Sequence, residues 1–427
     1  MQPRHARELL IASFHAALAG ADPLRLVPPC LPTPPPNGRT LVLGGGKAAA
    51  SMACAVETHW PGNAPLQGWV VTRYQHSLPT QRIQVIEASH PLPDGRGADT
   101  AQRMLAQAAT LTHNDLLLAL ISGGGSSLLA LPVAGISLQS LRRVTHALVN
   151  SGATIQEINT VRKHLTQLAG GQLARAAGAA RVHALILSDV VGDDPTHIAS
   201  GPCCADPSTF DDALAILERF RIEPDAAIQA YLQRGVAGEI ADTPKPGEAC
   251  FSRTVNHVIG GARQMLSAAM DYFQTQGVTV TLVNEAETQS SQQVAQAHAH
   301  RVRQIQAGSG GARPLVLLSG GETTVATQGS GRGGRNAEYL LALAIELQGM
   351  DTIHALAADT DGIDGTENNA GALIGPDTLS RARALGLNPE ELLASHDSYT
   401  CFAALNDLLV TGPTRTNVND YRAILIA

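Results

Sequence analysis

Glycine-rich turns follow several apolar runs of this sequence. Residues 41–53 read LVLGGGKAAASMA, residues 119–132 read ALISGGGSSLLALP, and residues 317–325 read LLSGGETTV. Glycine lets backbone N–H groups approach an anion closely, and a helix that starts after the turn favours negative charge. These turns predict phosphate binding, and the candidates are Gly45, Gly46, Ser122, Gly123, Gly124, Gly125, Ser126, Ser127, Gly320 and Gly321.

The first turn carries a lysine, Lys47, which could neutralise a phosphate charge. It is not a Walker A loop, because G-x-x-x-x-G-K-[ST] would need glycine and a hydroxyl residue where Leu41 and Ala48 stand. Gly44, Gly46 and Ala49 do fit the dinucleotide pattern G-x-G-x-x-A. However, that pattern expects an acidic residue at the end of the next strand. Residues 69–72 are followed by an arginine instead.

Acidic side chains also follow predicted strands. Asp189 ends an apolar run and is a candidate general base, while Asp193, Glu322 and Asp361 are candidate Mg²⁺ ligands, mostly through water. The stretch DTDGIDG at 359–365 is not an EF-hand loop, because its pattern of ligand positions is incomplete. Together with the basic side chains, these carboxylates suit a polyphosphate with a metal ion.

Two further cations and an amide complete the set of candidates. Arg335 and Asn336 lie in GRGGRN, and Lys163 lies in VRKHL. A guanidinium group can hold a carboxylate or a phosphate with two parallel hydrogen bonds, so Arg335 is the expected carboxylate clamp. Neither G-x-S-x-G nor H-E-x-x-H is present, and His90 in SHPLPDG is interpreted as a structural turn residue.

The elements that must position these residues alternate along the chain. Several of the expected strands are continuously apolar, as strands buried on both faces are, and helical patterns separate them. This alternation predicts an α/β fold with mostly parallel sheets. The expected strands are 40–44, 69–72, 83–88, 116–121, 182–189, 254–260, 278–283, 314–320 and 353–359.

The length of 427 residues indicates two domains. A Pro- and Gly-rich stretch at 234–250 lacks periodicity, so we expect an N-terminal domain over 1–240 and a C-terminal domain over 245–427. The net charge of −7 argues against a nucleic-acid partner. Six cysteines without a C-x-x-C pair are typical of reduced thiols in a cytoplasmic protein. We expect an amphipathic N-terminal helix and no membrane span.

These segments together resemble the class II glycerate 2-kinases with their C-terminal MOFRL domain. The similarity extends over nearly the whole chain, in the family's order, and includes 43–53, 87–97, 119–132, 158–174, 185–202, 317–325, 331–344, 357–372 and 411–420. The resemblance implies ATP- and Mg²⁺-dependent phosphorylation of the 2-hydroxyl of D-glycerate. It also implies a Rossmann-like N-terminal domain, a smaller α/β C-terminal domain and an active site in the cleft between them.

In that chemistry Lys47 and Arg335 would neutralise the phosphoryl group and the glycerate carboxylate, with Lys163 and Asn336 also binding substrate, and Asp189 would accept the proton. The resemblance is compatible with a homodimer. Ala337 stands where the family usually has glutamine, which could alter how the Arg335 loop is held. Two alternatives stay open: an NAD(P)H-dependent hydroxypyruvate reductase, and a non-catalytic protein that binds a nucleotide or an organic acid.

Overall fold

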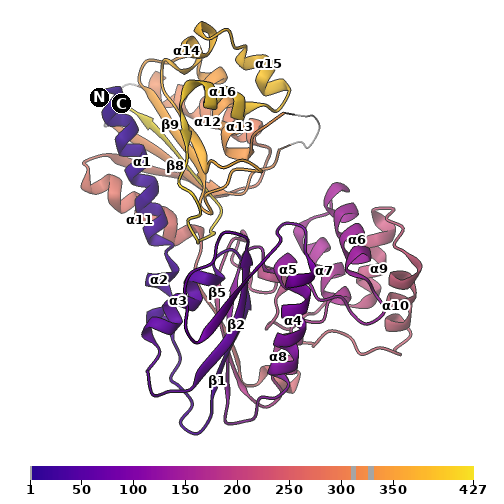
Figure 1. Ribbon diagram of the computed structural model, residues 1–427. Helices are drawn as coiled ribbons and strands as arrows, with labels where there is room; N and C mark the ends of the chain where they lie inside the picture. Colours follow the sequence, from indigo (N-terminus) through magenta and orange to yellow (C-terminus); the bar gives the residue numbers. More distant parts are fainter. Residues whose placement is uncertain (1, 309–313, 326–330) are drawn as a thin grey trace. The chain divides into compact units, whose positions relative to one another are not determined.

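The computed structural model describes residues 2–308, 314–325 and 331–427 and divides the chain into two compact α/β units (Figure 1). The Rossmann-like unit is Pro23–Ile259, and the C-terminal unit is Gly260–Ala427 together with Met1–Asp22. The chain therefore passes between the units twice, whereas the sequence predicts a single passage between 240 and 245. One reason is that the strand Thr254–Gly260, which follows the predicted boundary, pairs into the first sheet.

The sheet of the Rossmann-like unit has six strands in the order β3-β2-β1-β4-β5-β6. The pairs β2–β3, β1–β2, β1–β4 and β4–β5 are all parallel. This order reverses direction between β1 and β4, and ligands of such folds bind at the carboxyl ends of the strands on either side of that point. The strands are β1 (Thr40–Gly45), β2 (Leu66–Arg73), β3 (Ile83–Ala88), β4 (Leu116–Ser122), β5 (Arg181–Leu187) and β6 (Thr254–Gly260).

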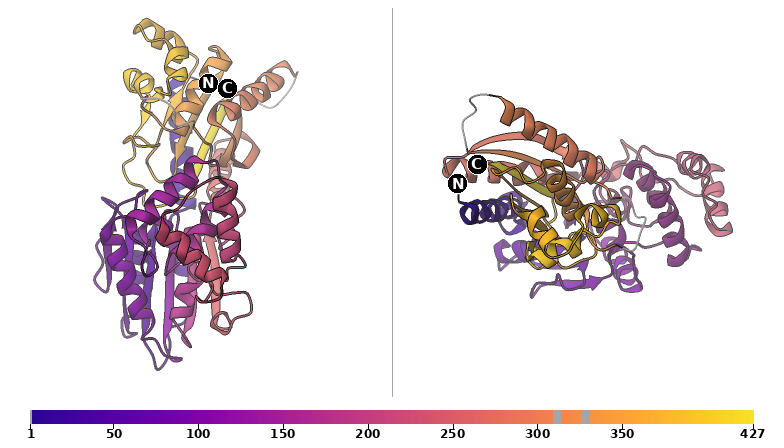
Figure 2. Two further views of the ribbon diagram at one scale, coloured as in Figure 1. Left: turned by 90° about the vertical axis from the view of Figure 1, so that its right-hand side faces the viewer. Right: turned by 90° about the horizontal axis from the view of Figure 1, so that it is seen from above.

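Four helices of this unit gather beside the sheet and share a hydrophobic core of their own (Figures 1 and 2). Their N-termini are capped by side chains, as at Ser137, whose hydroxyl accepts the N–H of Ser140 at 3.0 Å. Apolar residues at helical spacing, including Leu141, Val144 and Leu148, form the buried faces. The helices are α6 (Leu138–Asn150), α7 (Ile155–Leu165), α9 (Phe210–Arg219) and α10 (Ala226–Val236).

Five further α-helices of the described residues belong to this unit, and some of them are a single turn long. The helix α3 follows β1, and α5 follows β4, beginning at Gly125 within the SGGGSS segment. The hydrophobic cluster under the sheet joins residues of β1, β4 and β5 to α4 and α8. These helices are α2 (Pro23–Leu26), α3 (Ala49–His59), α4 (Gly95–Ala108), α5 (Gly125–Leu128) and α8 (Gln172–Ala176).

The C-terminal unit contains a second six-stranded sheet, in the order β11-β10-β9-β12-β8-β7. The strands β7 and β8 are paired in parallel; β12 is antiparallel to both β8 and β9, and β10 is antiparallel to β9. The expectation of mostly parallel sheets is thus correct for the first sheet and wrong for the second. The strands are β7 (Thr279–Glu287), β8 (Leu315–Gly321), β9 (Ile353–Asp359), β10 (Gly371–Ile374), β11 (Leu408–Leu409) and β12 (Asp420–Ile426).

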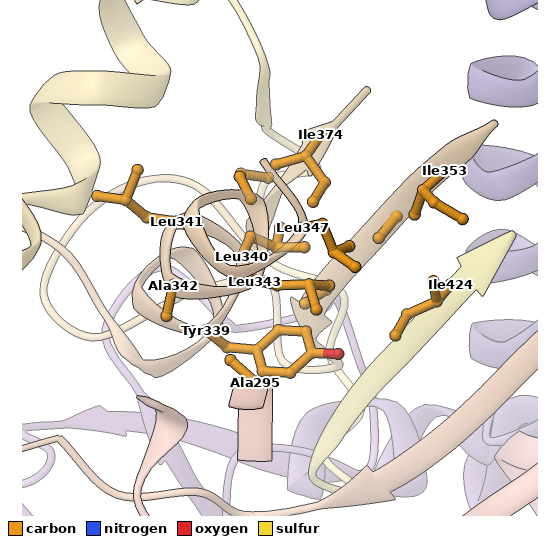
Figure 3. Packing of buried hydrophobic residues seen from close by; sticks show 14 of the residues in the cluster. Ala295, Tyr339, Leu340, Leu341, Ala342, Leu343, Leu347, Ile353, Ile374 and Ile424 are labelled. Atoms are coloured by element: carbon orange, nitrogen blue, oxygen red, sulfur yellow. The ribbon is translucent and has the colours of Figure 1, made fainter. Parts of the chain in front are cut away.

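Helices cover both faces of this second sheet. Ile424 and Ile426 of β12 belong to the cluster formed with α12 and α13 (Figure 3). Tyr421, three residues before Ile424, points to the opposite face, because side chains alternate along a strand, and its hydroxyl lies 2.7 Å from the Ser13 hydroxyl of α1. The helices are α1 (Pro3–Gly20), α11 (Ala262–Thr275), α12 (Ser291–Ala307), α13 (Arg335–Leu347), α14 (Thr378–Ala384), α15 (Pro389–Ala394) and α16 (Ser398–Leu405).

The helix α1 explains why the N-terminus belongs to the C-terminal unit. Leu9, Leu10 and Phe14 are buried, and α1 packs on α11 and on the strands β9 and β12. The run Pro3–Cys30, which includes this helix, is long and apolar enough to cross a membrane by length and composition, which the sequence analysis did not expect. In the structure 39% of the tested window is buried, and α1 packs on α11, β9 and β12.

Candidate functional site

Two of the predicted turns of the Rossmann-like unit, those with Lys47 and Ser122, meet where the strand order reverses. Lys47 lies in the turn between β1 and α3, and its N–H donates to the Gly123 carbonyl at 2.8 Å. The Ser122 hydroxyl accepts the N–H of Ala48 at 3.1 Å, so the turns after β1 and β4 are tied together. The Thr72 hydroxyl of β2 donates to the Lys47 carbonyl at 3.4 Å. These bonds fix the backbone from which the half-buried lysine side chain extends.

Glycine is required at two positions of these turns. Gly124 has φ +81°, and a Cβ there would lie 3.0 Å from the His90 ring and 3.3 Å from Cγ of Lys47. A Cβ on Gly46, at φ +141°, would lie 2.1 Å from the Ser122 hydroxyl oxygen. The backbone of the second turn is therefore in close contact with the lysine side chain. The same contacts bring His90 to the site, although the sequence indicated only a structural role for it.

The hydroxyl groups of the SGGGSS turn bond to the protein itself. The Ser126 hydroxyl lies 2.7 Å from that of Ser200, which in turn donates to Oδ1 of Asn159 at 3.0 Å. The Ser127 hydroxyl donates to the Gly124 carbonyl at 3.1 Å. These bonds hold the shape of the turn, so the backbone N–H groups are the atoms best suited to an anion.

Two predicted acidic residues follow β5 in the same unit. Asp189 is half-buried, two residues after the last residue of the strand. The Ser188 hydroxyl holds this segment by accepting the N–H of Val190 at 3.3 Å. Asp193 is exposed, with φ +55°, in the turn that follows. Asp189 thus lies just beyond the carboxyl end of β5, the strand beside β4, whereas Asp193 lies at the surface.

Lys163 is engaged inside the Rossmann-like unit. Its side chain is buried in α7, and Nζ donates to Oδ1 of Asp206 at 3.3 Å. Burial alone would raise the pKa of Asp206, but the Lys163 charge and the hydroxyls of Ser208 and Thr243 lower it below its usual value. The ammonium group therefore has a carboxylate partner in the core, and the predicted contact of Lys163 with a substrate stays a prediction.

In the C-terminal unit, Arg335 begins α13 and contacts three carboxylates. Its Nε donates to Asp420 at 2.9 Å, Nη1 to Glu322 at 2.9 Å and Nη2 to Asp359 at 2.8 Å. Burial would lower the pKa of Arg335, but the charges of Asp420, Asp359 and Glu322 raise it well above its ordinary value. Three of the five N–H donors of the guanidinium group are used in this way.

Asn336 connects this cluster to a further buried acid. Its side-chain amide donates to Oδ1 of Asp420 at 2.8 Å, and its N–H donates to Asp364 at 3.0 Å. Asp364 also accepts the N–H of Ala337 at 2.8 Å, so the backbone of that position is held whatever its side chain. Burial raises the pKa of Asp364 to about 6, against the opposing effect of these N–H groups.

The remaining candidates of this unit are in different surroundings. Asp361 is buried, and its Oδ1 accepts the N–H of Ile363 at 2.8 Å; Glu322 is exposed. Gly320 and Gly321 are not in a loop but within β8, paired with Tyr421 and Asp420 of β12. Across the three described ranges, no His, Cys, Asp or Glu side chains are grouped in threes as a protein-only metal site requires.

The structure thus forms two clusters, one in each unit. The turns that carry Lys47 and Ser122–Ser127 meet in one of them, and Arg335, Asn336 and Glu322 meet in the other. Sequence reasoning missed Asp359, Asp420 and Asp364 as partners of the second cluster. The acidic stretch DTDGIDG contains Asp359 and Asp364 and could have indicated both of them. Asp420 lies on a strand that the sequence analysis did not predict.

Comparison with known proteins gives matches over most of the chain. Residues 9–233 match the family described as a domain of unknown function, DUF4147, and residues 315–420 match the MOFRL family. The D-glycerate 2-kinase of Thermotoga maritima is 36% identical, covering 98% of each chain. The glycerate 2-kinase of Pyrococcus horikoshii is 38% identical, covering 90% of this chain and 86% of the relative.

A protein of Agrobacterium vitis, provisionally named as a hydroxypyruvate reductase, is 47% identical over 99% of this chain and 94% of its own. The crystal structure of glycerate kinase from Thermotoga maritima superposes with a TM-score of 0.86 at 36% identity, covering 100% of both chains. Identity at this level over the full length of the relatives shows common descent as well as a common fold. The chain therefore belongs to the class II glycerate kinase family, which joins a DUF4147 domain to a MOFRL domain.

Proposed function

We propose that this protein is a glycerate 2-kinase, which transfers the γ-phosphoryl group of ATP to the 2-hydroxyl of D-glycerate. The observation that carries this proposal is the cluster at the point where the strand order reverses. There a lysine, two glycine-rich turns and a strand-end aspartate converge on the carboxyl edge of a parallel sheet. Glycerate kinases at 36–38% identity over most of their length support the same reaction.

We assign the roles within the first cluster as follows. In the reaction, the 2-oxygen of glycerate forms a bond to the γ-phosphorus while the bond to the β,γ-bridging oxygen breaks. The Asp189 carboxylate accepts the hydroxyl proton, and ADP leaves. The Lys47 ammonium neutralises charge on the transferred group, and the backbone of Ser122–Ser127 holds the nucleotide phosphates. Lys163 pairs with Asp206 in the core, and its contact with substrate stays a prediction.

We assign the second cluster to the glycerate carboxylate and the metal ion. Arg335 has two N–H donors that its carboxylate partners do not use, and Asn336 holds Asp420 beside it. Glu322 and Asp361 fit the way in which Mg²⁺ is usually held with nucleotides, by one or two carboxylates together with phosphate oxygens and water. When bound, Mg²⁺ would supply charge neutralisation of the phosphates. The excess of carboxylates around Arg335 favours a substrate complex that carries this cation.

The site keeps one feature of the reductase alternative. The strand β2 ends in Arg73, and an arginine near that position can accommodate the 2′-phosphate of NADP. The turn from β1 to α3 likewise has the strand–turn–helix form of a dinucleotide site. NADPH-dependent reduction of hydroxypyruvate is therefore the second candidate function. An assay can distinguish it from the kinase reaction, because the reductase reaction does not require ATP.

Phosphorus NMR of the reaction mixture tests the proposal. Protein with ATP, Mg²⁺ and D-glycerate should give ADP and 2-phosphoglycerate, and Lys47→Ala should reduce turnover by about 10²-fold, as loss of a transition-state donor does. Arg103→Ala, which removes an exposed cation on α4, is the matched control and should retain wild-type turnover. Oxidation of NADPH by hydroxypyruvate without phosphoglycerate formation would replace the kinase assignment by the reductase. Wild-type turnover of Lys47→Ala would remove the role of the lysine.

The proposal extends to the setting of the enzyme. The six cysteines are free thiols, consistent with the reducing cytoplasm. We therefore place the enzyme there, acting on small dissolved substrates.

A further inference from the structure

A pocket of the Rossmann-like unit opens between the SGGGSS turn and the helix α6. Of the residues that line it, only Ser126 and Ser127 have a role in the proposed function. Its volume is about 200 Å³. Apolar atoms make up most of its wall, and Pro91, Leu141, Val149 and Ser126 are among the residues that line it. Two arginines, Arg142 of α6 and Arg162 of α7, also line it. None of the described lining residues is acidic.

Among the residues that the structure describes, the two arginines have no protein partner that would explain their position. Within the described residues, neither guanidinium group forms an ion pair, and Nε of Arg142 is buried without a hydrogen-bond acceptor. Burial lowers the pKa of Arg162 to about 10, and no nearby carboxylate opposes that effect. Taking a cation out of water without a partner is costly, so such a pair is typical of a site for an anion.

Residues that line the pocket are close in sequence to residues that surround Lys47. Pro91 and Ser126 line it, while His90, which precedes Pro91, and Gly124, two residues before Ser126, surround the Lys47 side chain. An apolar slot that leads from such a phosphate turn suits a flat, apolar base, and arginines suit phosphate oxygens. The volume is below the roughly 300–1,000 Å³ of pockets that enclose a whole ligand, so it suits one part of a nucleotide.

We propose that this pocket binds the adenine nucleotide, with the base against Pro91, Leu141 and Val149 and with Arg142 and Arg162 on the phosphates. This inference rests on the proposed kinase function and specifies where its donor substrate is held. Glycerate is a small polar acid that an apolar slot does not suit. Arg142 and Arg162 should therefore affect nucleotide affinity and leave glycerate affinity unchanged.

Steady-state kinetics of Arg142→Gln and Arg162→Gln test the proposal. Each should raise KM for ATP by about 10- to 100-fold, the change expected for loss of a hydrogen bond to a charged group, with KM for glycerate within about two-fold. Arg142→Lys and Arg162→Lys, which keep the charge, should recover part of the affinity. The matched control is Arg143→Gln, the next residue of α6, which is exposed and pairs with Asp225 at 2.9 Å outside the pocket. Unchanged KM for ATP in both glutamine variants would overturn the proposal.

Calorimetric titration with ADP keeps this test separate from the test of the kinase function. If the wild-type protein shows no kinase activity, the proposed function fails. ADP binding that is weakened in the two glutamine variants and not in Arg143→Gln still supports the pocket, even without turnover. Equal ADP affinity in all four proteins overturns it. Binding of NADPH without binding of ADP also overturns it, because a dinucleotide would then be the occupant.

Discussion

Replacing Arg335 by methionine should destabilise the C-terminal unit strongly, because one side chain neutralises three carboxylates. The cost can be worked out from their exposure. The Glu322 side chain is 52% exposed, so its pair contributes only about 0–1 kcal/mol. The side chains of Asp359 and Asp420 are 6% and 0% exposed, and both would lose the Arg335 cation, although Asp420 would keep the buried Arg422, which pairs with it at 2.5 Å. Breaking such a buried pair costs about 3–5 kcal/mol, so we expect Arg335→Met to lower the stability of the unit by that amount.

Hydrogen exchange measured by mass spectrometry is the appropriate assay. A chain with two units does not unfold in a single two-state step, so the exchange of amides in β9 and β12 reports the C-terminal unit directly. These amides should exchange faster in Arg335→Met, while those of β1 and β4 should not change. Arg335→Lys should show a smaller effect, because lysine keeps the positive charge, but not wild-type exchange, because an ammonium group lacks the fork that reaches three carboxylates.

The matched control is Arg332→Met in the same segment. Arg332 pairs with Glu367 at 2.7 Å, but its own side chain is 57% exposed. Its replacement should leave exchange in β9 and β12 unchanged. If Arg335→Met also left these amides unchanged, the ion pairs of Asp359 and Asp420 would not stabilise the unit, and the reasoning from burial would be refuted.

Three other predictions concern single side chains. Gly124→Ala should lower kcat/KM more than ten-fold by crowding Lys47, whereas Gly135→Ala, with similar φ (+86°) but open space around its Cβ, should leave it unchanged; equal losses would refute crowding. The pKa of Asp364 is about 6 in the folded protein, which is above its value in the unfolded chain. Protonation of Asp364 therefore stabilises the fold at low pH, and this stabilisation is lost as the pH rises through 6. The stability of the wild type relative to Asp364→Asn should therefore fall by ~1 kcal/mol between about pH 5 and 7.5, as measured by denaturation; a constant difference would contradict the shift. Burial raises the pKa of Cys204 to about 12, so mass spectrometry should find it alkylated by iodoacetamide at about pH 8 only after unfolding.

The sequence by itself determined the elements and the turns that carry the chemistry. All nine expected strands are present, because an apolar run of four to eight residues between turn residues is a local signal. The helix after Ser137 also begins at the predicted cap. The turn at Lys47 and the SGGGSS turn could be identified for the same reason, since glycine at the end of a strand is visible without knowing what lies beside it.

Only the tertiary structure decided which elements are neighbours. The strand β12 was not predicted, yet it lies between β8 and β9 and places Asp420 on Arg335, a residue 85 positions earlier in the chain. His90 reaches Lys47 because β3 and β1 belong to one sheet, and α1 joins the C-terminal unit because its apolar face packs on α11. Periodicity reports which side of an element is buried and not what buries it. The partners of a charged or apolar side chain depend on pairing between distant segments, which the whole fold selects together.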